Sequence, residues 1–327
     1  QVVHCLLETC AYDVDIATFR IRAIQKESRG NELHVDAEGW RVDRQTGSLF
    51  EYFDDSDHNI FLFGGSSTFG FAVGDEETLP AYIGKNLDAK SVDGSSISVF
   101  NLGQIGYSMA EELYLLVDQL RRGRTPNLAV FYDGVNERPG PNAGELPKTG
   151  WLADDVRSAV RSAQEPPWVS INWFDIPRLP VQRAAAGARR RLQRLLGESE
   201  AEEKAGQKAQ PARNVEVPAD RYIRAASVVR TLAAAYGFKA VFVLQPSGVF
   251  LERPEDRRYN YEAGPETALI NYFQGLYKEI LMRAAGQSPP ILVHDLSEAL
   301  TEASRNNNDL FLDWQHLTPD GNQFMAR

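Results

Sequence analysis

Short apolar runs alternate with longer helical stretches along most of this chain, and this alternation restricts its fold more than any other feature. Brief apolar runs predict buried strands, and longer amphipathic stretches predict helices. Strands that are linked by helices make right-handed crossovers, which gives a parallel sheet with helices on both faces. The sequence therefore predicts a doubly wound α/β domain. Its strands are expected at 60–63, 97–101, 127–132, 239–244 and 291–295, and its helices at 78–87, 109–122, 219–236 and 266–285, with a further short helix from Leu296.

Two parts of the chain do not follow this alternation, the N-terminal segment and one internal segment. Residues 1–55 mix short alternating runs with turn signals, which predicts a strand-rich N-terminal lead-in without a core of its own. Residues 139–217 are first rich in proline and glycine, then helical, and finally charged and poor in apolar residues. We expect this segment to be an insertion that is mobile in part and is a candidate lid. Residues 56–138 and 218–327 then form a single α/β core.

Composition excludes several classes of function. The chain has 35 basic and 45 acidic residues, a net charge of -10, which argues against nucleic acid or an anionic membrane surface as the main partner. Its two cysteines, Cys5 and Cys10, cannot form a disulfide framework or a zinc cluster, and both a local bridge and two free thiols remain open. We expect no metal and no cofactor. The chain starts at Gln1, so we expect that a signal or a membrane anchor has been trimmed from it.

Four polar segments stand out, and three of them directly follow predicted strands. Because the carboxyl ends of parallel strands meet at one edge of a sheet, these segments are expected to lie together where such folds bind ligands. The segments are residues 64–70, 101–106, 133–137 and 313–321.

These segments contain the parts of a serine nucleophile. Ser66 lies in a glycine-rich turn, and His316 with Asp313 supplies a base and the acceptor that orients it. The backbone N–H groups of Ser66 and Gly106 and the amide of Asn136 are candidate donors to an oxyanion. Simpler roles also fit, because Gly106 and Asn136 could only shape turns and His316 could be structural.

The same four segments resemble the blocks of the SGNH (GDSL-like) hydrolase superfamily. The family's first block, GDSxTxG, is similar to residues 64–70, with Gly65 in place of the aspartate. Its third block, GxND, is similar to the segment around Asn136, with Glu137 in place of the aspartate. The glycine of the second block matches Gly106, and the DxxH block matches Asp313 and His316.

This resemblance implies a flavodoxin-like SGNH hydrolase fold and a catalytic triad of Ser66, His316 and Asp313. It implies a lipase-like serine esterase that acts on a carbohydrate O-acetyl group or a small lipid ester. Two alternatives stay open, an O-acyltransferase that modifies a polysaccharide or glycan and a non-catalytic binding module on the same fold. The resemblance to exported members also implies an extracytoplasmic or membrane-anchored protein, although a cytoplasmic location stays open.

Overall fold

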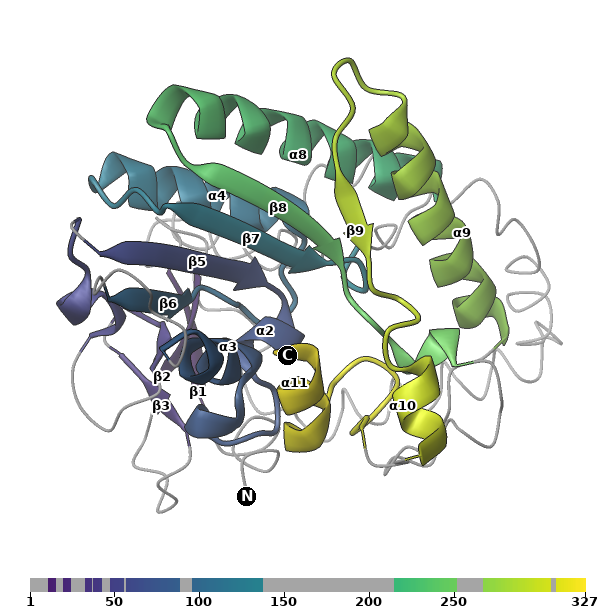
Figure 1. The fold of residues 1–327 in the computed structure, drawn as a ribbon, viewed down its shortest axis with the longest axis horizontal. Helices are drawn as coiled ribbons and strands as arrows, with labels where there is room; N and C mark the ends of the chain where they lie inside the picture. The colour runs from purple at the N-terminus through teal and green to yellow at the C-terminus, as the bar shows by residue number, and fades with distance from the viewer. Residues whose placement is uncertain are drawn as a thin grey trace, which may run out of the picture.

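A five-stranded parallel sheet forms the centre of the molecule (Figure 1). The computed structural model describes residues 11–15, 20–24, 33–36, 38–42, 48–55, 57–88, 96–137, 215–251, 267–306 and 310–327. The strand order is β6-β5-β7-β8-β9, and every neighbouring pair is parallel. Counted along the chain, this is the flavodoxin-like order 2-1-3-4-5. The predicted doubly wound α/β fold is confirmed. The strands are β5 (His58–Gly64), β6 (Ile97–Asn101), β7 (Leu128–Asp133), β8 (Lys239–Leu244) and β9 (Val293–Asp295).

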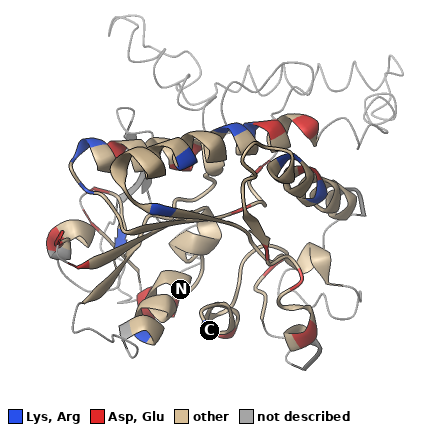
Figure 2. Ribbon diagram, turned by 45° about the horizontal axis from the view of Figure 1, so that its top comes forward, with Lys and Arg blue, Asp and Glu red and all other residues tan. Residues whose placement is uncertain are grey.

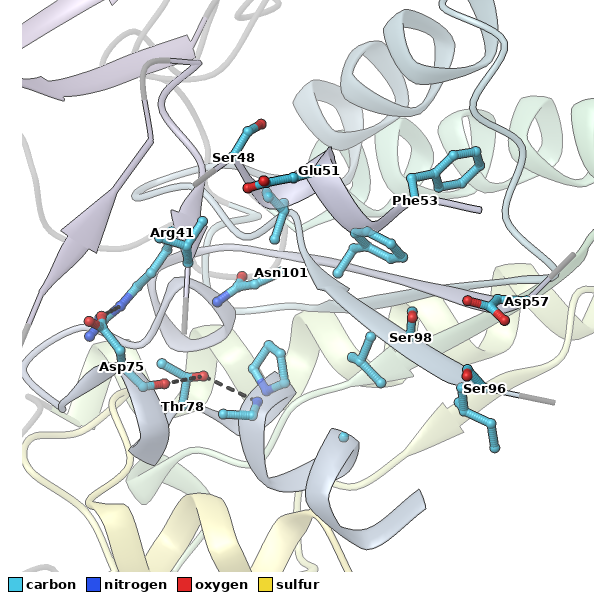
Figure 3. A pocket seen from close by; sticks show the side chains of 18 of the residues that line it. Arg41, Ser48, Glu51, Phe53, Asp57, Asp75, Thr78, Ser96, Ser98 and Asn101 are labelled. Atoms are coloured by element: carbon cyan, nitrogen blue, oxygen red, sulfur yellow. Dashed lines mark hydrogen bonds and ion pairs between the residues drawn. The ribbon is translucent and has the colours of Figure 1, made fainter. Parts of the chain in front are cut away.

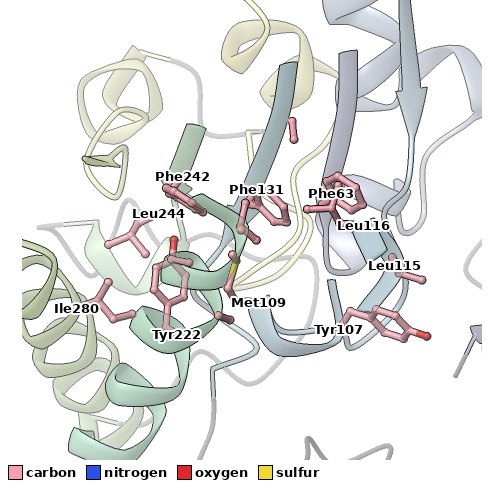
Figure 4. Close-up of a cluster of buried hydrophobic side chains, with 14 of the residues drawn as sticks. Phe63, Tyr107, Met109, Leu115, Leu116, Phe131, Tyr222, Phe242, Leu244 and Ile280 are labelled. Atoms are coloured by element: carbon pink, nitrogen blue, oxygen red, sulfur yellow. The ribbon is translucent and has the colours of Figure 1, made fainter. Parts of the chain in front are cut away.

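Helices cover both faces of this sheet, because successive strand residues point to opposite sides. On one face, Phe63, Phe131 and Phe242 pack against helices that supply Tyr222, Ile280 and other apolar side chains (Figure 4). On the other face, Leu62 and Val243 belong to a second cluster with residues of the shorter helices. The first layer contains α4 (Met109–Arg121), α8 (Glu216–Tyr236) and α9 (Thr267–Ala285), and the second contains α3 (Leu79–Asp88) and α11 (Pro319–Met325).

The charged residues are distributed unevenly between the helices and the sheet. Figure 2 shows Lys, Arg, Asp and Glu gathered on the helices, whereas the strands of the central sheet are mostly uncharged. This distribution is expected of amphipathic helices that bury one face against a sheet. Among the described helices, none is both long enough and apolar enough to cross a membrane.

Part of the predicted N-terminal lead-in packs directly onto the sheet. β1 (Ala11–Asp15) pairs antiparallel with β2 (Arg20–Ile24), and β3 (His34–Val35) pairs in the same way with β4 (Arg41–Val42). Trp40 and Phe50 are buried in the main hydrophobic cluster together with Phe61 and Phe100 of the sheet. Phe50 stacks on Phe100 at 5.3 Å between ring centroids.

The predicted elements differ from the observed ones mainly at their ends. β6 and β8 have the expected bounds, whereas β9 starts at Val293, later than expected. A helix was expected directly after it, but α10 (Thr301–Asn306) begins only after a turn in which Ser297 N–H donates to Asp295 Oδ1 at 2.9 Å. α8 starts at Glu216, inside the predicted insertion. Residues 139–214 of that insertion, and both cysteines, lie outside the described residues, so the domain boundaries stay a prediction.

Candidate active site

The four polar segments meet at the carboxyl edge of the sheet. Ser66 begins the short helix α2 (Ser66–Phe69) directly after β5, Gly106 follows β6, and Asn136 follows β7. His316 lies just before α11. These residues surround a pocket of about 270 Å³. Its lining consists of Ser66, Phe71, Ile105, Gly106, Asn136, Gln315 and His316.

Two of these lining residues, Ser66 and His316, form a continuous hydrogen-bonded chain with Asp313. Ser66 Oγ lies 2.7 Å from His316 Nε2, and His316 Nδ1 lies 2.7 Å from Asp313 Oδ2. Ser66 and His316 are both buried. An imidazole that donates from Nδ1 to a carboxylate leaves Nε2 free to accept a proton from the serine.

Asp313 is held as an anion by its surroundings. Burial, the largest single effect, would raise its pKa, but it is outweighed by the combined effect of the hydrogen bond and charge of His316 and the backbone N–H groups of Gln315 and His316. Both of these N–H groups donate to Asp313 Oδ1 at 2.8 Å. The net result is a lowered pKa, so the carboxylate can both orient His316 and stabilise its protonated form.

Donors for an oxyanion converge on the same pocket. Asn136 Nδ2 donates to the Tyr107 carbonyl at 2.8 Å, and since an amide nitrogen carries two hydrogens, the second is available to a ligand. Gly106 has φ 78°, a conformation that favours glycine. Ser66 is the first residue of α2, where the backbone N–H has no partner within the helix.

The first departure from the family pattern, Gly65, has a steric explanation. A Cβ atom at this position would lie 2.1 Å from Asn136 Nδ2 and 3.2 Å from the Tyr107 carbonyl. The Asn136 amide therefore occupies the space that any other side chain at position 65 would need. Gly65 lets the turn after β7 approach the turn that carries Ser66 this closely.

The second departure, Glu137, ties that turn to the next helix. Glu137 Oε1 accepts a hydrogen bond from the N–H of Met109, the first residue of α4, at 2.7 Å. Its carbonyl accepts another from Tyr272 Oη at 2.8 Å. Glu137, next to Asn136, is thus fixed through its side chain by α4 and through its backbone by α9.

Glu137 belongs to a group of three buried carboxyl groups behind the site, with Glu112 and Asp133. Burial raises the pKa of all three, and the charge of Asp133 adds to the effect on Glu137, whose pKa rises to about 8. These groups therefore retain protons in the folded protein at pH values where exposed carboxyl groups have lost them. In the part of the chain that the structure describes, no group of three or more His, Cys, Asp or Glu side chains could hold a metal ion.

Sequence reasoning missed the residues that follow β8. Gln245 Nε2 donates to Ser67 Oγ at 3.1 Å, and Ser67 Oγ donates to the Gln315 carbonyl at 3.1 Å. The N–H of Gly248 donates to the Trp314 carbonyl at 2.9 Å. The first two of these bonds connect α2, which begins at Ser66, to the loop that carries His316, and the third connects the residues after β8 to the same loop. The sequence could have indicated this segment, because polar residues directly follow the predicted strand 239–244, as they follow three other predicted strands.

Phe71 and Gln315 are two further contacts of His316 that the sequence did not indicate. The Phe71 ring stacks on the imidazole with centroids 4.4 Å apart and an interplanar angle of 28°. Gln315 Nε2 lies 3.2 Å from His316 Nε2.

A larger cavity, of about 640 Å³, lies beside the edge strand β6, and it contains none of the predicted site residues (Figure 3). Its lining includes several charged and hydroxyl side chains, among them Asp57, Ser96 and Ser98. Of the four polar segments, only 101–106 reaches it, through Asn101, so size alone does not identify the candidate active site.

Neither the scan against protein-family models nor the search of curated proteins finds a match to this chain. Some solved structures are similar to it at low identity. The acetyl xylan esterase AlAXEase is 14% identical, with a TM-score of 0.42, over 82% of this chain and 96% of that one. A G-D-S-L family lipolytic protein from Desulfitobacterium hafniense is 14% identical, with a TM-score of 0.42, over 83% and 96%. A mutant of Axe2, an acetylxylan esterase from Geobacillus stearothermophilus, is 13% identical, with a TM-score of 0.43, over 83% and 92%.

Proposed function

We propose that this chain is a serine esterase that hydrolyses an O-acyl ester through an acyl-enzyme intermediate. The observation that carries the proposal is the hydrogen-bonded chain from Ser66 through His316 to Asp313, with both distances at 2.7 Å, inside a pocket that also holds Asn136. A nucleophile, a base and an orienting carboxylate in contact are the requirement for acyl transfer.

The reaction follows from these positions. Ser66 Oγ attacks the ester carbonyl while His316 Nε2 accepts the hydroxyl proton, and Asp313 stabilises the resulting imidazolium. The negative charge that develops on the carbonyl oxygen is placed near the Asn136 amide and the N–H groups of Ser66 and Gly106. His316 then gives its proton to the departing alcohol, which leaves Ser66 acylated. A water molecule repeats the sequence and releases the acid, so the enzyme is restored.

The pocket favours an uncharged acyl group. Two of its lining residues, Phe71 and Ile105, are apolar, and no Lys or Arg side chain belongs to its described lining. We infer that the acyl portion of the ester lies against these side chains, with a carbohydrate or a small lipid alcohol as the leaving group.

Hydrolysis of p-nitrophenyl acetate, butyrate, octanoate and palmitate tests the proposal. Ser66→Ala and His316→Ala should each lower kcat by several orders of magnitude. A matched control is Ser227→Ala, because the hydroxyl of this serine donates to the Ile223 carbonyl within α8 and the residue does not line the pocket. A fluorophosphonate probe should label the wild type and the control but not Ser66→Ala. Equal rates in all proteins and no labelling of the wild type would refute the proposal, and products formed only with an added acceptor sugar would indicate transfer instead of hydrolysis.

A further inference from the structure

The N-terminal strand pair β3–β4 contacts the loop that follows the nucleophile helix. Residues 33–42 and 69–75 are joined by several hydrogen bonds and by a small apolar cluster in which Leu33 and Phe69 are buried. Val35, Phe71 and Ile105 pack against this cluster, and the last two also line the reactive pocket. The pair therefore forms the support behind one wall of the pocket.

Arg41 of β4 makes the central contacts. Its side chain is 1% exposed, and Nε donates to Asp75 Oδ1 at 2.9 Å (Figure 3). Nη2 donates to the Val73 carbonyl at 2.6 Å, and Nη1 donates to the Gly70 carbonyl. A planar guanidinium presents its donors in a fixed fork, so one side chain holds three acceptors in a defined relation.

The loop between those carbonyls has an unusual backbone. Gly70 has φ 88° and Ala72 has φ 63°, and a positive φ at a residue other than glycine persists only where the surroundings hold it. Arg41 bonds on both sides of Ala72. It therefore opposes the relaxation that this backbone would otherwise undergo.

Phe71 lies between the two carbonyls that Arg41 holds. Its N–H donates to the Ser66 carbonyl at 2.9 Å, and its ring stacks on His316 at 4.4 Å. The imidazole is thus restrained at its edge by Asp313 and on its face by Phe71.

We propose that Arg41 is a positioning residue for His316, which acts by fixing the Gly70 and Val73 carbonyls so that the Phe71 ring stays against the imidazole. The catalytic part of this inference rests on the proposed function. The ring contact itself does not, so it is tested by a measurement that needs no substrate.

The first measurement is the NMR signal of the His316 Cε1–H in protein with ¹³C-labelled histidine, assigned with His316→Ala. A stacked aromatic ring shifts this signal, so Phe71→Leu should remove the shift. Arg41→Met should remove most of it, and Arg41→Lys, which keeps the charge but not the fork, should remove part of it. The matched control is Arg283→Met, since Arg283 makes its ion pairs with Glu279 and Asp220 on α9 and α8.

The second measurement is kcat for the p-nitrophenyl ester that the wild type prefers. Arg41→Met should lower kcat by about tenfold to a hundredfold, because a displacement of about 1 Å in a reacting group can cost about a hundredfold. KM should change by less. The double variant Arg41→Met/Phe71→Leu should be no slower than the slower single variant, because both changes remove the same contact.

Two results would overturn the inference. One is an unchanged His316 signal in Arg41→Met or Arg41→Lys, and the other is fully additive losses of kcat in the double variant. If Arg41→Met does not fold, Arg41→Lys and Phe71→Leu still decide the matter. A wild type without activity or labelling would refute the proposed function alone, because the NMR measurement would still report whether Arg41 holds the ring.

Discussion

The contact between Gly65 and Asn136 leads to a specific prediction for Gly65→Ala. An added Cβ would lie 2.1 Å from Asn136 Nδ2, whereas real Cβ contacts essentially never fall under 3.0 Å. The amide must therefore move by roughly 1 Å. The backbone at Gly65 has a negative φ, -80°, so the substitution does not place alanine in the left-handed region and mainly tests the side-chain contact.

The size of the effect follows from the proposed role of Asn136. Loss of one oxyanion donor has cost about 10²- to 10³-fold in kcat, or about 2.7–4 kcal/mol, in a studied protease. A donor that is moved by about 1 Å instead of removed should fall near the lower end, so we expect kcat of Gly65→Ala to fall by about 10²-fold. Gly65→Asp, which restores the residue of the family's first block, should be no better, because its Cβ meets the same amide.

The assay is kcat for p-nitrophenyl acetate in Gly65→Ala, Asn136→Ala and the double variant. If Gly65→Ala acts through the amide, the double variant should be about as slow as Asn136→Ala alone. The control is Gly84→Ala, where an added Cβ would meet nothing closer than Val99 at 3.9 Å. A Gly65→Ala enzyme with kcat near that of the wild type would refute the reasoning, and so would losses that add in full.

Three further predictions concern residues around the site. Asp313→Asn should lower kcat by about 10⁴-fold, as in a related triad, because an amide no longer favours the reactive tautomer of His316. Glu137, with its pKa raised from 4.5 to about 8, keeps a proton in the folded state that the unfolded chain loses, so wild-type stability falls as pH rises from about 4.5 to about 8. Between pH 5 and pH 8 the unfolding free energy of the wild type, measured by urea denaturation, should therefore fall by about 3 kcal/mol relative to that of Glu137→Gln. Gln245→Ala removes the donor to Ser67 Oγ and should lower kcat by about tenfold with little change in KM.

Each of these predictions has an outcome that would contradict it. An Asp313→Asn enzyme with wild-type kcat would mean that the carboxylate does not orient the histidine. If the unfolding free energies of Glu137→Gln and the wild type differ by the same amount across that pH range, the buried carboxyl does not titrate as described. Unchanged kinetics in Gln245→Ala would limit the segment after β8 to a structural role.

The central sheet and the position of the site could be predicted because both depend on local pattern. Apolar runs and helical stretches are visible in sequence, and a parallel sheet brings the carboxyl ends of its strands to one edge. Ser66 and His316 lie 250 residues apart along the chain. The end of a predicted strand placed Ser66 at that edge, whereas His316, in a segment that follows no predicted strand, was chosen from its residue chemistry and from the family resemblance. The bounds of β9 and α10 were less accurate, since a turn with a side-chain bond to Asp295 replaced the first part of the expected helix.

The sequence by itself thus determined the α/β fold class and the residues of the candidate triad, because periodicity and residue chemistry are properties of short segments. Only the tertiary structure revealed why position 65 is a glycine, that Gln245 connects two active-site segments, and that Arg41 supports the pocket from the N-terminal region. These facts depend on contacts between segments that are distant in sequence. A buried arginine in a two-residue strand leaves no periodic signal, so its partners are decided only when the chain packs.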